Sequence, residues 1–163
     1  MEILNEKVLQ RLKTKFPDAI LEAAEFRGEL TVVILKERIV EVCKFLKEDS
    51  ELRFDFLADL CGIDMKTPSR RFGVIYNMYS YMNKYRLRVK TFAEEEHPKV
   101  QTVTGIWETA NWHERETFDM FGIIFEGHPD LRRMYMPDEF EYHPLRKDFP
   151  LMGIRGSLEL PKK

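Results

Sequence analysis

The stretch RFGVIYNMYSYMNKYRLRVKTFA, residues 71–93, decides the fold class. It holds two runs of aromatic and branched aliphatic residues separated by the polar pair Asn83-Lys84, which is typical of two strands joined by a turn. The second run alternates between core-type residues and bases, which are Leu87, Val89 and Thr91 against Arg86, Arg88 and Lys90. Because successive side chains of a strand point to opposite faces, the pattern predicts a strand with one wet face that carries three bases.

Other runs on the N-terminal side have the same strand-like character. RFDFLADLCGIDM, residues 53–65, is separated from the hairpin by a break at Pro68. AILEAAEFR, residues 19–27, and ELTVVIL, residues 29–35, lie on either side of Gly28, so a second hairpin is the simplest interpretation. The sequence therefore predicts about five strands.

Helical spacing marks three further segments. Their bulky positions are Leu4, Val8, Leu12 and Phe16 in residues 1–16, Ile39, Val42, Cys43 and Leu46 in residues 36–49, and Trp107, Trp112 and Phe118 in residues 103–121. Pro17 ends the first pattern. The predicted order is α-β-β-α-β-β-β-α. This order favours an α+β fold of two layers, with helices packed on one mixed or antiparallel sheet, over residues 1–125.

Residues 126–163 have a different character. They contain Pro129, Pro137, Pro144, Pro150 and Pro161, a density that excludes a helix or a central strand. They also carry interleaved apolar side chains, which disordered tails lack. We therefore expect an extended C-terminal arm that wraps over a surface supplied by a second protein.

Composition excludes several classes of function. The chain has 163 residues, a net charge of −2 and a pI near 6.1, so its overall charge does not favour binding to nucleic acid or anionic lipid. Cys43 and Cys61 have no CxxC spacing, which favours two reduced thiols in a reducing, intracellular compartment. No apolar run approaches the roughly 20 residues that span a bilayer. We expect a soluble, intracellular protein, and this leaves open that it docks on a component of a membrane.

Catalytic motifs are incomplete. The sequence HERET, residues 113–117, resembles the HExxH helix of zinc proteases, but Thr117 stands where the second histidine must be. No glycine pattern fits a phosphate-binding loop, and GxSxG is absent. A stand-alone metal-dependent hydrolase that uses His113, His128 and Asp130 is a distant alternative.

The charged residues of the 114–119 segment leave two interpretations open. On a helix, Arg115 and Asp119 lie four residues apart, beside Glu114 and Glu116. They form either a solvated charged face or a cluster buried against a partner. In the arm, acids interrupt the basic residues, which favours protein binding over nucleic-acid binding.

Residues 114–151 resemble the signature region of the C-type (30 kDa) subunit of proton-translocating NADH:quinone oxidoreductase, respiratory complex I. The family pattern falls on Glu114, Arg115, Glu116, Asp119, Met120, Phe121, His128, Arg132 and Arg133, followed by PLRKD at 144–148. Upstream, the strand-like runs occur in the order of the family's sheet region. This chain departs from the family at Phe140, where a Trp is usual, and at the pair Tyr142-His143.

The resemblance implies a component of the peripheral arm of an NADH:quinone translocase, with no catalytic residue, metal or cofactor of its own. FMN, iron–sulfur clusters and quinone would lie on partner subunits. The chain would serve assembly and would hold the quinone-site subunit (49 kDa, D-type), with contacts to the B-type and other peripheral-arm subunits, on the cytoplasmic face of the inner membrane. The implied interface residues, here called the signature residues, are Glu114, Arg115, Glu116, Asp119, His128, Pro129, Asp130, Arg132, Arg133, Pro144, Arg146, Lys147 and Asp148. The alternative is the equivalent component of a ferredoxin- or F420-linked quinone reductase or of an energy-converting membrane hydrogenase.

Overall fold

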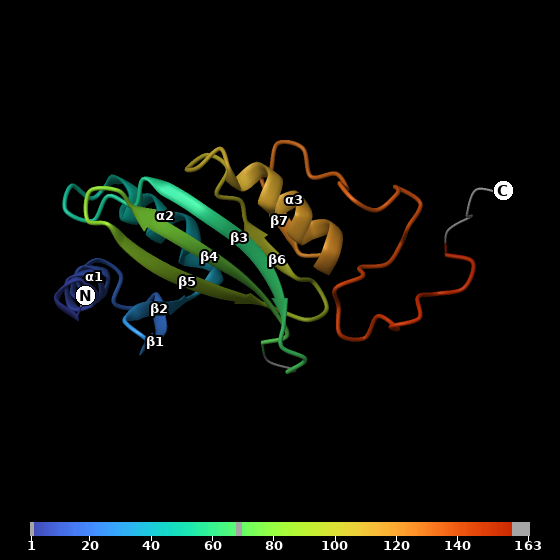
Figure 1. Cartoon of the computed structure of the whole chain (residues 1–163), viewed down its shortest axis with the longest axis horizontal. Helices are drawn as coiled ribbons and strands as arrows, with labels where there is room; N and C mark the ends of the chain where they lie inside the picture. The colour runs from blue at the N-terminus through green and yellow to red at the C-terminus, as the bar shows by residue number, and fades with distance from the viewer. Residues whose placement is uncertain (1, 68–69, 158–163) are drawn as a thin grey trace.

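The computed structural model describes residues 2–67 and 70–157, so Pro68 and Pro161 lie outside the described residues. The main elements, drawn in Figure 1, are α1 (Glu2–Lys15), β1 (Ile20–Phe26), β2 (Glu29–Ile34), α2 (Ile39–Glu48), β3 (Phe56–Asp64), β4 (Phe72–Ser80), β5 (Tyr85–Ala93), β6 (Lys99–Gln101), α3 (Ala110–Phe121) and β7 (Ile124–Glu126). A short 3-10 turn, Lys36–Arg38, leads into α2. The predicted order of three helices and five strands is confirmed.

The five long strands form one mixed sheet in the order β1-β2-β5-β4-β3. The predicted hairpins pair β1 with β2 and β4 with β5 in antiparallel fashion, and β3 pairs antiparallel with β4. The central pair β2 and β5 is parallel, so the connection between them runs through α2, β3 and β4. This non-local pairing makes the sheet mixed.

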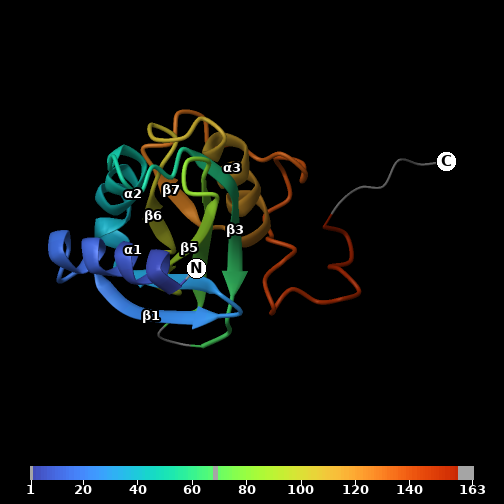
Figure 2. The same cartoon turned by 60° about the vertical axis from the view of Figure 1, so that its left-hand side comes forward.

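Apolar side chains of the helices cover one face of this sheet. In α1 and the residue that follows it, Val8, Leu12 and Phe16 are buried, and α2 buries Ile39 and its neighbours on the predicted face. Figure 2 shows α1 and α2 on the same side of the sheet. The opposite face of β4 and β5 carries the partly exposed alternate residues. The fold therefore has two layers, as predicted.

The third helix lies along β3 (Figure 1). Gly62 makes this approach possible, because a Cβ there would collide with the side chains of Phe121 and Thr117. The helix starts at Ala110, which corrects the prediction that it starts near residue 103. Residues 103–109 instead form turns, in which Trp107 Nε1 donates to the carbonyl of Phe54 at 3.2 Å.

Two short strands were not predicted. β6 and β7 form a separate parallel pair, with Val100 opposite Phe125. After β7, residues 127–157 contain no helix or strand. In the part of the chain that the structure describes, no helix is long and apolar enough to cross a membrane.

Candidate functional site

Several signature residues lie where α3 meets residues 127–157, the described part of the arm after β7. Asp119 anchors this junction. Its carboxylate is fully buried and accepts hydrogen bonds from the backbone N–H groups of Met134, Tyr135 and Met136 at 3.0, 2.7 and 3.0 Å. Arg133 Nη1 donates a fourth bond at 2.7 Å. Three successive amides thus curl around one carboxylate, which fixes the path of the arm.

Electrostatics favour the charged form of Asp119. Burial alone would raise the pKa of its carboxyl, but the three amides and Arg133 outweigh burial and lower it. Arg133 also donates to the carbonyl of Tyr142 at 3.2 Å, so it links α3 to two parts of the arm.

Arg115 bonds the segment of the arm just before the three amides that bind Asp119. Its guanidinium donates to the carbonyls of Arg132 and Arg133 at 3.2 and 3.3 Å and lies 5.0 Å from the ring of Trp112. The four-residue spacing to Asp119 therefore produces no helix-surface pair, because each side chain bonds the arm instead. Glu114, Arg115 and Asp119 are buried and Glu116 is exposed, and the groups that Arg115 and Asp119 bond belong to the same chain.

Glu114 faces away from the arm and into the core. Its carboxylate is fully buried and accepts bonds from the backbone N–H of Val103 at 2.8 Å and from the hydroxyl of Thr102. Burial raises the pKa of Glu114 to about 7, against the opposing effect of these two bonds. The residue ties α3 to the loop that replaces the first part of the predicted helix.

The end of α3 receives the middle of the arm. Gly122 adopts a left-handed conformation with φ of 73°, and a Cβ there would collide with Arg146 and His143. Arg146 Nε donates to the carbonyl of Phe121 at 2.6 Å, and His143 Nδ1 donates to the carbonyl of Asp119 at 2.9 Å. Burial is the main cause that lowers the pKa of His143, which favours the neutral ring.

A second cluster, which we call the latch, joins the arm to the sheet. It consists of Asp64, Arg71, Glu95 and Asp148. Arg71 pairs with all three carboxylates, and Asp64 accepts the backbone N–H of Lys147 at 2.9 Å. The guanidinium of Arg71 also lies over the ring of the residue that begins β4.

The sequence analysis missed the latch residues Asp64, Arg71 and Glu95. One pattern pointed to Asp64, because strand alternation places it on the same face as Leu60, where a carboxylate needs a partner. Burial would raise the pKa of Asp64, but its amide donors and Arg71 lower it.

The remaining signature residues lie on the outside of the arm or on the open side of α3. The exposed ones are Glu116, Pro129, Asp130, Arg132 and Lys147, with His128 and Pro144 partly exposed. Asp148 is also exposed, but its carboxylate pairs with Arg71 in the latch. Apolar side chains accompany them: Tyr135 is 59%, Tyr142 40% and Leu145 55% exposed, and Leu151 and Met152 are almost fully exposed. Other apolar residues of the arm turn inward, among them Phe140, which is 4% exposed. The contact of the signature residues with another protein stays a prediction.

The histidines serve local structure. His128 donates from Nε2 to the carbonyl of Asn111 at 3.2 Å and accepts the N–H of Asp130 at Nδ1, so both ring nitrogens are engaged. His113 lies with Nδ1 at 3.7 Å from the carboxylate of Asp59. Within residues 2–67 and 70–157, no three His, Cys, Asp or Glu side chains gather as a metal site requires.

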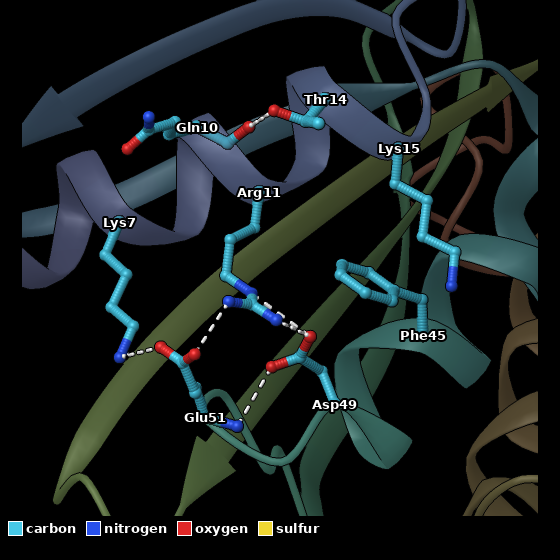
Figure 3. A pocket seen from close by; sticks show the side chains of 8 residues that line it. All are labelled: Lys7, Gln10, Arg11, Thr14, Lys15, Phe45, Asp49 and Glu51. Atoms are coloured by element: carbon cyan, nitrogen blue, oxygen red, sulfur yellow. Dashed lines mark hydrogen bonds and ion pairs between the residues drawn. The ribbon is translucent and has the colours of Figure 1, made fainter.

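A separate groove of about 650 Å³ lies between α1 and the end of α2 (Figure 3). Arg11 reaches across it to Asp49 and Glu51, and Lys7 also pairs with Glu51. Lys15 lies over the ring of Phe45 at 4.5 Å. Because the acids pair with bases across the groove, it joins α1 to the core and offers little free charge to a ligand.

Comparisons with known proteins agree with the resemblance of the sequence. The family model "Respiratory-chain NADH dehydrogenase, 30 Kd subunit" matches residues 32–155. The C-type subunit of NADH-quinone oxidoreductase from Roseiflexus sp. (strain RS-1) is 54% identical over 151 residues, which cover 93% of this chain and 87% of the relative. The protein of the same name from Geotalea uraniireducens (strain Rf4) is 52% identical over 149 residues, 91% of this chain and 90% of the relative.

Solved structures show the same fold. A trypsin-resistant fragment of Nqo5 is 36% identical and matches with a TM-score of 0.64, over 77% of this chain and 98% of the fragment. A chain of the membrane-bound sulfane sulfur reductase, an archaeal respiratory membrane complex, is 23% identical with a TM-score of 0.76, over 90% of this chain and 86% of that one. At that identity, the second match shows the fold alone. The expected family is confirmed: the chain belongs to the 30 kDa subunit family of respiratory-chain NADH dehydrogenase, whose members include the C-type subunits of NADH-quinone oxidoreductase.

Proposed function

We propose that the chain is a non-catalytic, cofactor-free component of the peripheral arm of an NADH:quinone oxidoreductase. In this proposal it serves assembly and holds the quinone-site subunit in place while electrons pass from NADH to quinone and protons are translocated. FMN, iron–sulfur clusters and quinone lie on partner subunits, and the chain reaches the cytoplasmic face of the membrane only through the complex.

One observation carries the proposal: the arm is fixed on its inner side and exposes large apolar side chains among the charged ones on its outer side. Asp119, Arg115 and the latch bond its backbone at several points. The outer side exposes Tyr135 and Leu145, with Leu151 beyond them. Covering exposed apolar groups with a partner lowers the free energy of the complex. A pre-shaped arm with exposed apolar groups therefore suits a protein interface.

A non-catalytic role is supported by how the charged signature residues are used. Glu114, Arg115 and Asp119 each bond groups of their own chain. They therefore shape the arm, and we assign the contact with the quinone-site subunit, and with the B-type subunit beside it, to the exposed signature residues and the exposed apolar side chains of the outer side. The identity of these partners rests on the family resemblance.

The proposal is tested by variants that change the outer side and keep the inner bonds. Leu145→Asp alters an exposed arm residue, and a chain that ends at Pro150 removes Leu151 and Met152 while retaining Asp119 and the latch. The matched control is Ile3→Asp, which places the same charge at an apolar residue of α1 that is 81% exposed.

We expect each arm variant to fold with an unchanged melting temperature as an isolated chain. In membranes of cells that carry only the variant, we expect at least tenfold less chain bound to the quinone-site subunit and a parallel loss of NADH:quinone activity. The control should retain both. If the arm variants assemble and respire as the wild type does, the arm is not the interface.

A further inference from the structure

The strands β3, β4 and β5 lie side by side in the sheet (Figure 1). Their register places side chains in rows across the sheet face opposite the helices. The rows are Phe56, Tyr79 and Arg86, then Asp59, Asn77 and Arg88, then Cys61, Ile75 and Lys90. Among the described residues, the helices pack on the other face, and α3 reaches this one only at the β3 edge, where His113 Nδ1 lies 3.7 Å from the carboxylate of Asp59. The arm also bonds the other face, through Asp64. This face is therefore a surface separate from the arm.

The middle row is bonded within itself. Asn77 Nδ2 donates to the carboxylate of Asp59 at 3.3 Å, and Arg88 Nε donates to the carbonyl oxygen of the Asn77 side chain at 3.2 Å. Arg88 Nη2 then reaches Glu29 of β2 at 3.2 Å. This chain of bonds spans four strands, and its guanidinium is paired with Glu29.

The first row is aromatic and exposed. The rings of Phe56 and Tyr81 lie 5.9 Å apart, and those of Tyr79 and Tyr81 lie 5.2 Å apart, edge to face. Tyr81 is 60% and Met82 51% exposed. Arg86 lies over the ring of Tyr79 at 5.6 Å. Tyr, Phe, Met and Arg are the residue types that protein interfaces favour.

Two bases of this face have no acidic partner in the part of the chain that the structure describes. Arg88 pairs with Glu29 and Arg70 with Glu22, but no described carboxylate lies within 4.0 Å of Arg86 or Lys90. These two residues are on the same side of β5, four positions apart, which corresponds to about 13 Å along a strand.

We propose that this open face is a second docking surface, for a partner protein that presents two carboxylates about 13 Å apart to Arg86 and Lys90. Between them, apolar side chains of the partner would cover Tyr79 and Ile75. A second copy of this chain fits poorly, because a two-fold pairing of the face would bring its unpaired bases together. An anionic membrane fits poorly too, because Asp59 and Glu29 would face the lipid headgroups.

The test uses the intact complex and so rests on the proposed assembly. The rate of acetylation at Lys90 is compared between the isolated full-length chain and the complex, with the exposed Lys13 of α1 as control. Carbodiimide then couples amines directly to carboxylates that they contact. We expect acetylation of Lys90 to be at least tenfold slower in the complex, acetylation of Lys13 to be less affected, and Lys90 to couple to an Asp or Glu of another protein of the complex.

Charge variants supply the second measurement. Arg86→Glu combined with Lys90→Glu should lower retention of the chain in the complex at moderate salt at least tenfold, while Arg86→Lys combined with Lys90→Arg should retain it. Equal acetylation of Lys90 in the isolated chain and in the complex would overturn the proposal. Carbodiimide coupling of Lys90 to a second copy of this chain would also overturn it. If Lys90 stays open while the arm is protected, the docking surface is wrong and the arm interface stands; a chain that enters no complex overturns both.

Discussion

Two buried carboxylates on the same helix show how local donors decide ionisation. Asp119 receives three amides and a guanidinium, and its pKa is lowered although burial opposes this. Glu114 receives one amide and one hydroxyl, and burial raises its pKa to about 7. The additional donors of Asp119, one of them a charged guanidinium, favour its ionised form, whereas burial prevails at Glu114.

The raised pKa of Glu114 predicts a pH dependence of stability. In the unfolded chain this carboxyl ionises near 4.5 and in the folded chain near 7, so the folded state holds an extra proton between these values. The free energy of unfolding should therefore fall as pH rises from about 4.5 through 7, by up to about 3 kcal/mol. Glu114→Gln should remove this component of the slope, measured by urea unfolding at pH 5, 6, 7 and 8.

Glu116→Gln is the matched control, because it makes the same change on the exposed side of the same helix. It should leave the slope between pH 5 and 8 as in the wild type. A wild-type slope in Glu114→Gln as well would show that another group holds the proton.

Gly122 supports a second prediction. Ala at this position must adopt a φ of 73° and would push Arg146 and His143 away, so Gly122→Ala should lower stability by about 1–3 kcal/mol and loosen the arm. Gly105→Ala is the control, because open space surrounds that glycine. Thermal unfolding and limited trypsinolysis after Arg146 measure the two effects. Equal trypsin rates in both variants would exclude a role of Gly122 in docking the arm.

The site could be predicted from the sequence only in part. The signature region led to Arg115 and Asp119, but the sequence could not show that these side chains bond their own chain. The latch joins Asp64 to the amide of Lys147, 83 residues later, and no local pattern encodes such a contact. Only the position of Asp64 on an apolar strand face pointed to it.

At the scale of elements, long periodic segments were predicted well. The alternation of β5 and the four-residue spacing of α1 reflect burial on one face, which the structure confirms. The start of α3 was wrong because Trp107 fills the core from a turn, where its indole N–H bonds a carbonyl. β6 and β7 were missed because three residues are too few to show a period, and their pairing is non-local.

The latch belongs to this scale, since it joins β3 and β4 to the arm. Arg71→Gln should leave the buried carboxylate of Asp64 without its guanidinium and loosen the arm. We expect the amide of Lys147 to exchange its hydrogen about five- to tenfold faster, which corresponds to about 1 kcal/mol of local opening. Hydrogen exchange with mass spectrometry of residues 140–157 measures this change.

Lys99→Gln provides the comparison, because it removes an exposed base that pairs with Glu126 at 3.4 Å. Exchange in residues 140–157 should then match the wild type. If Arg71→Gln gives the same result, the arm is held by Asp119 and Arg146 alone.

At the scale of the whole molecule, we expect unfolding of the core and release of the arm to be separate events. Leu12 is fully buried between α1 and the sheet, so Leu12→Ala should lower the free energy of unfolding by about 2–5 kcal/mol. Leu145→Ala, at a residue 55% exposed, should change it by less than about 0.5 kcal/mol. Urea unfolding, followed by tryptophan fluorescence, measures the free energy of unfolding of both variants. A similar decrease in both would mean that the arm is part of the core.

The contacts of the arm with α3 also bear on quality control during synthesis. The groups that shape the arm, Asp119, the end of α3 and Asp64, exist in the right places only after the sheet and helices have packed. The arm leaves the ribosome after these groups because it follows them in the sequence. Since folding proceeds from the N-terminal side as the chain emerges, the groups can be in place when the arm appears. A partner that binds the arm in its docked shape therefore selects chains whose core has already folded.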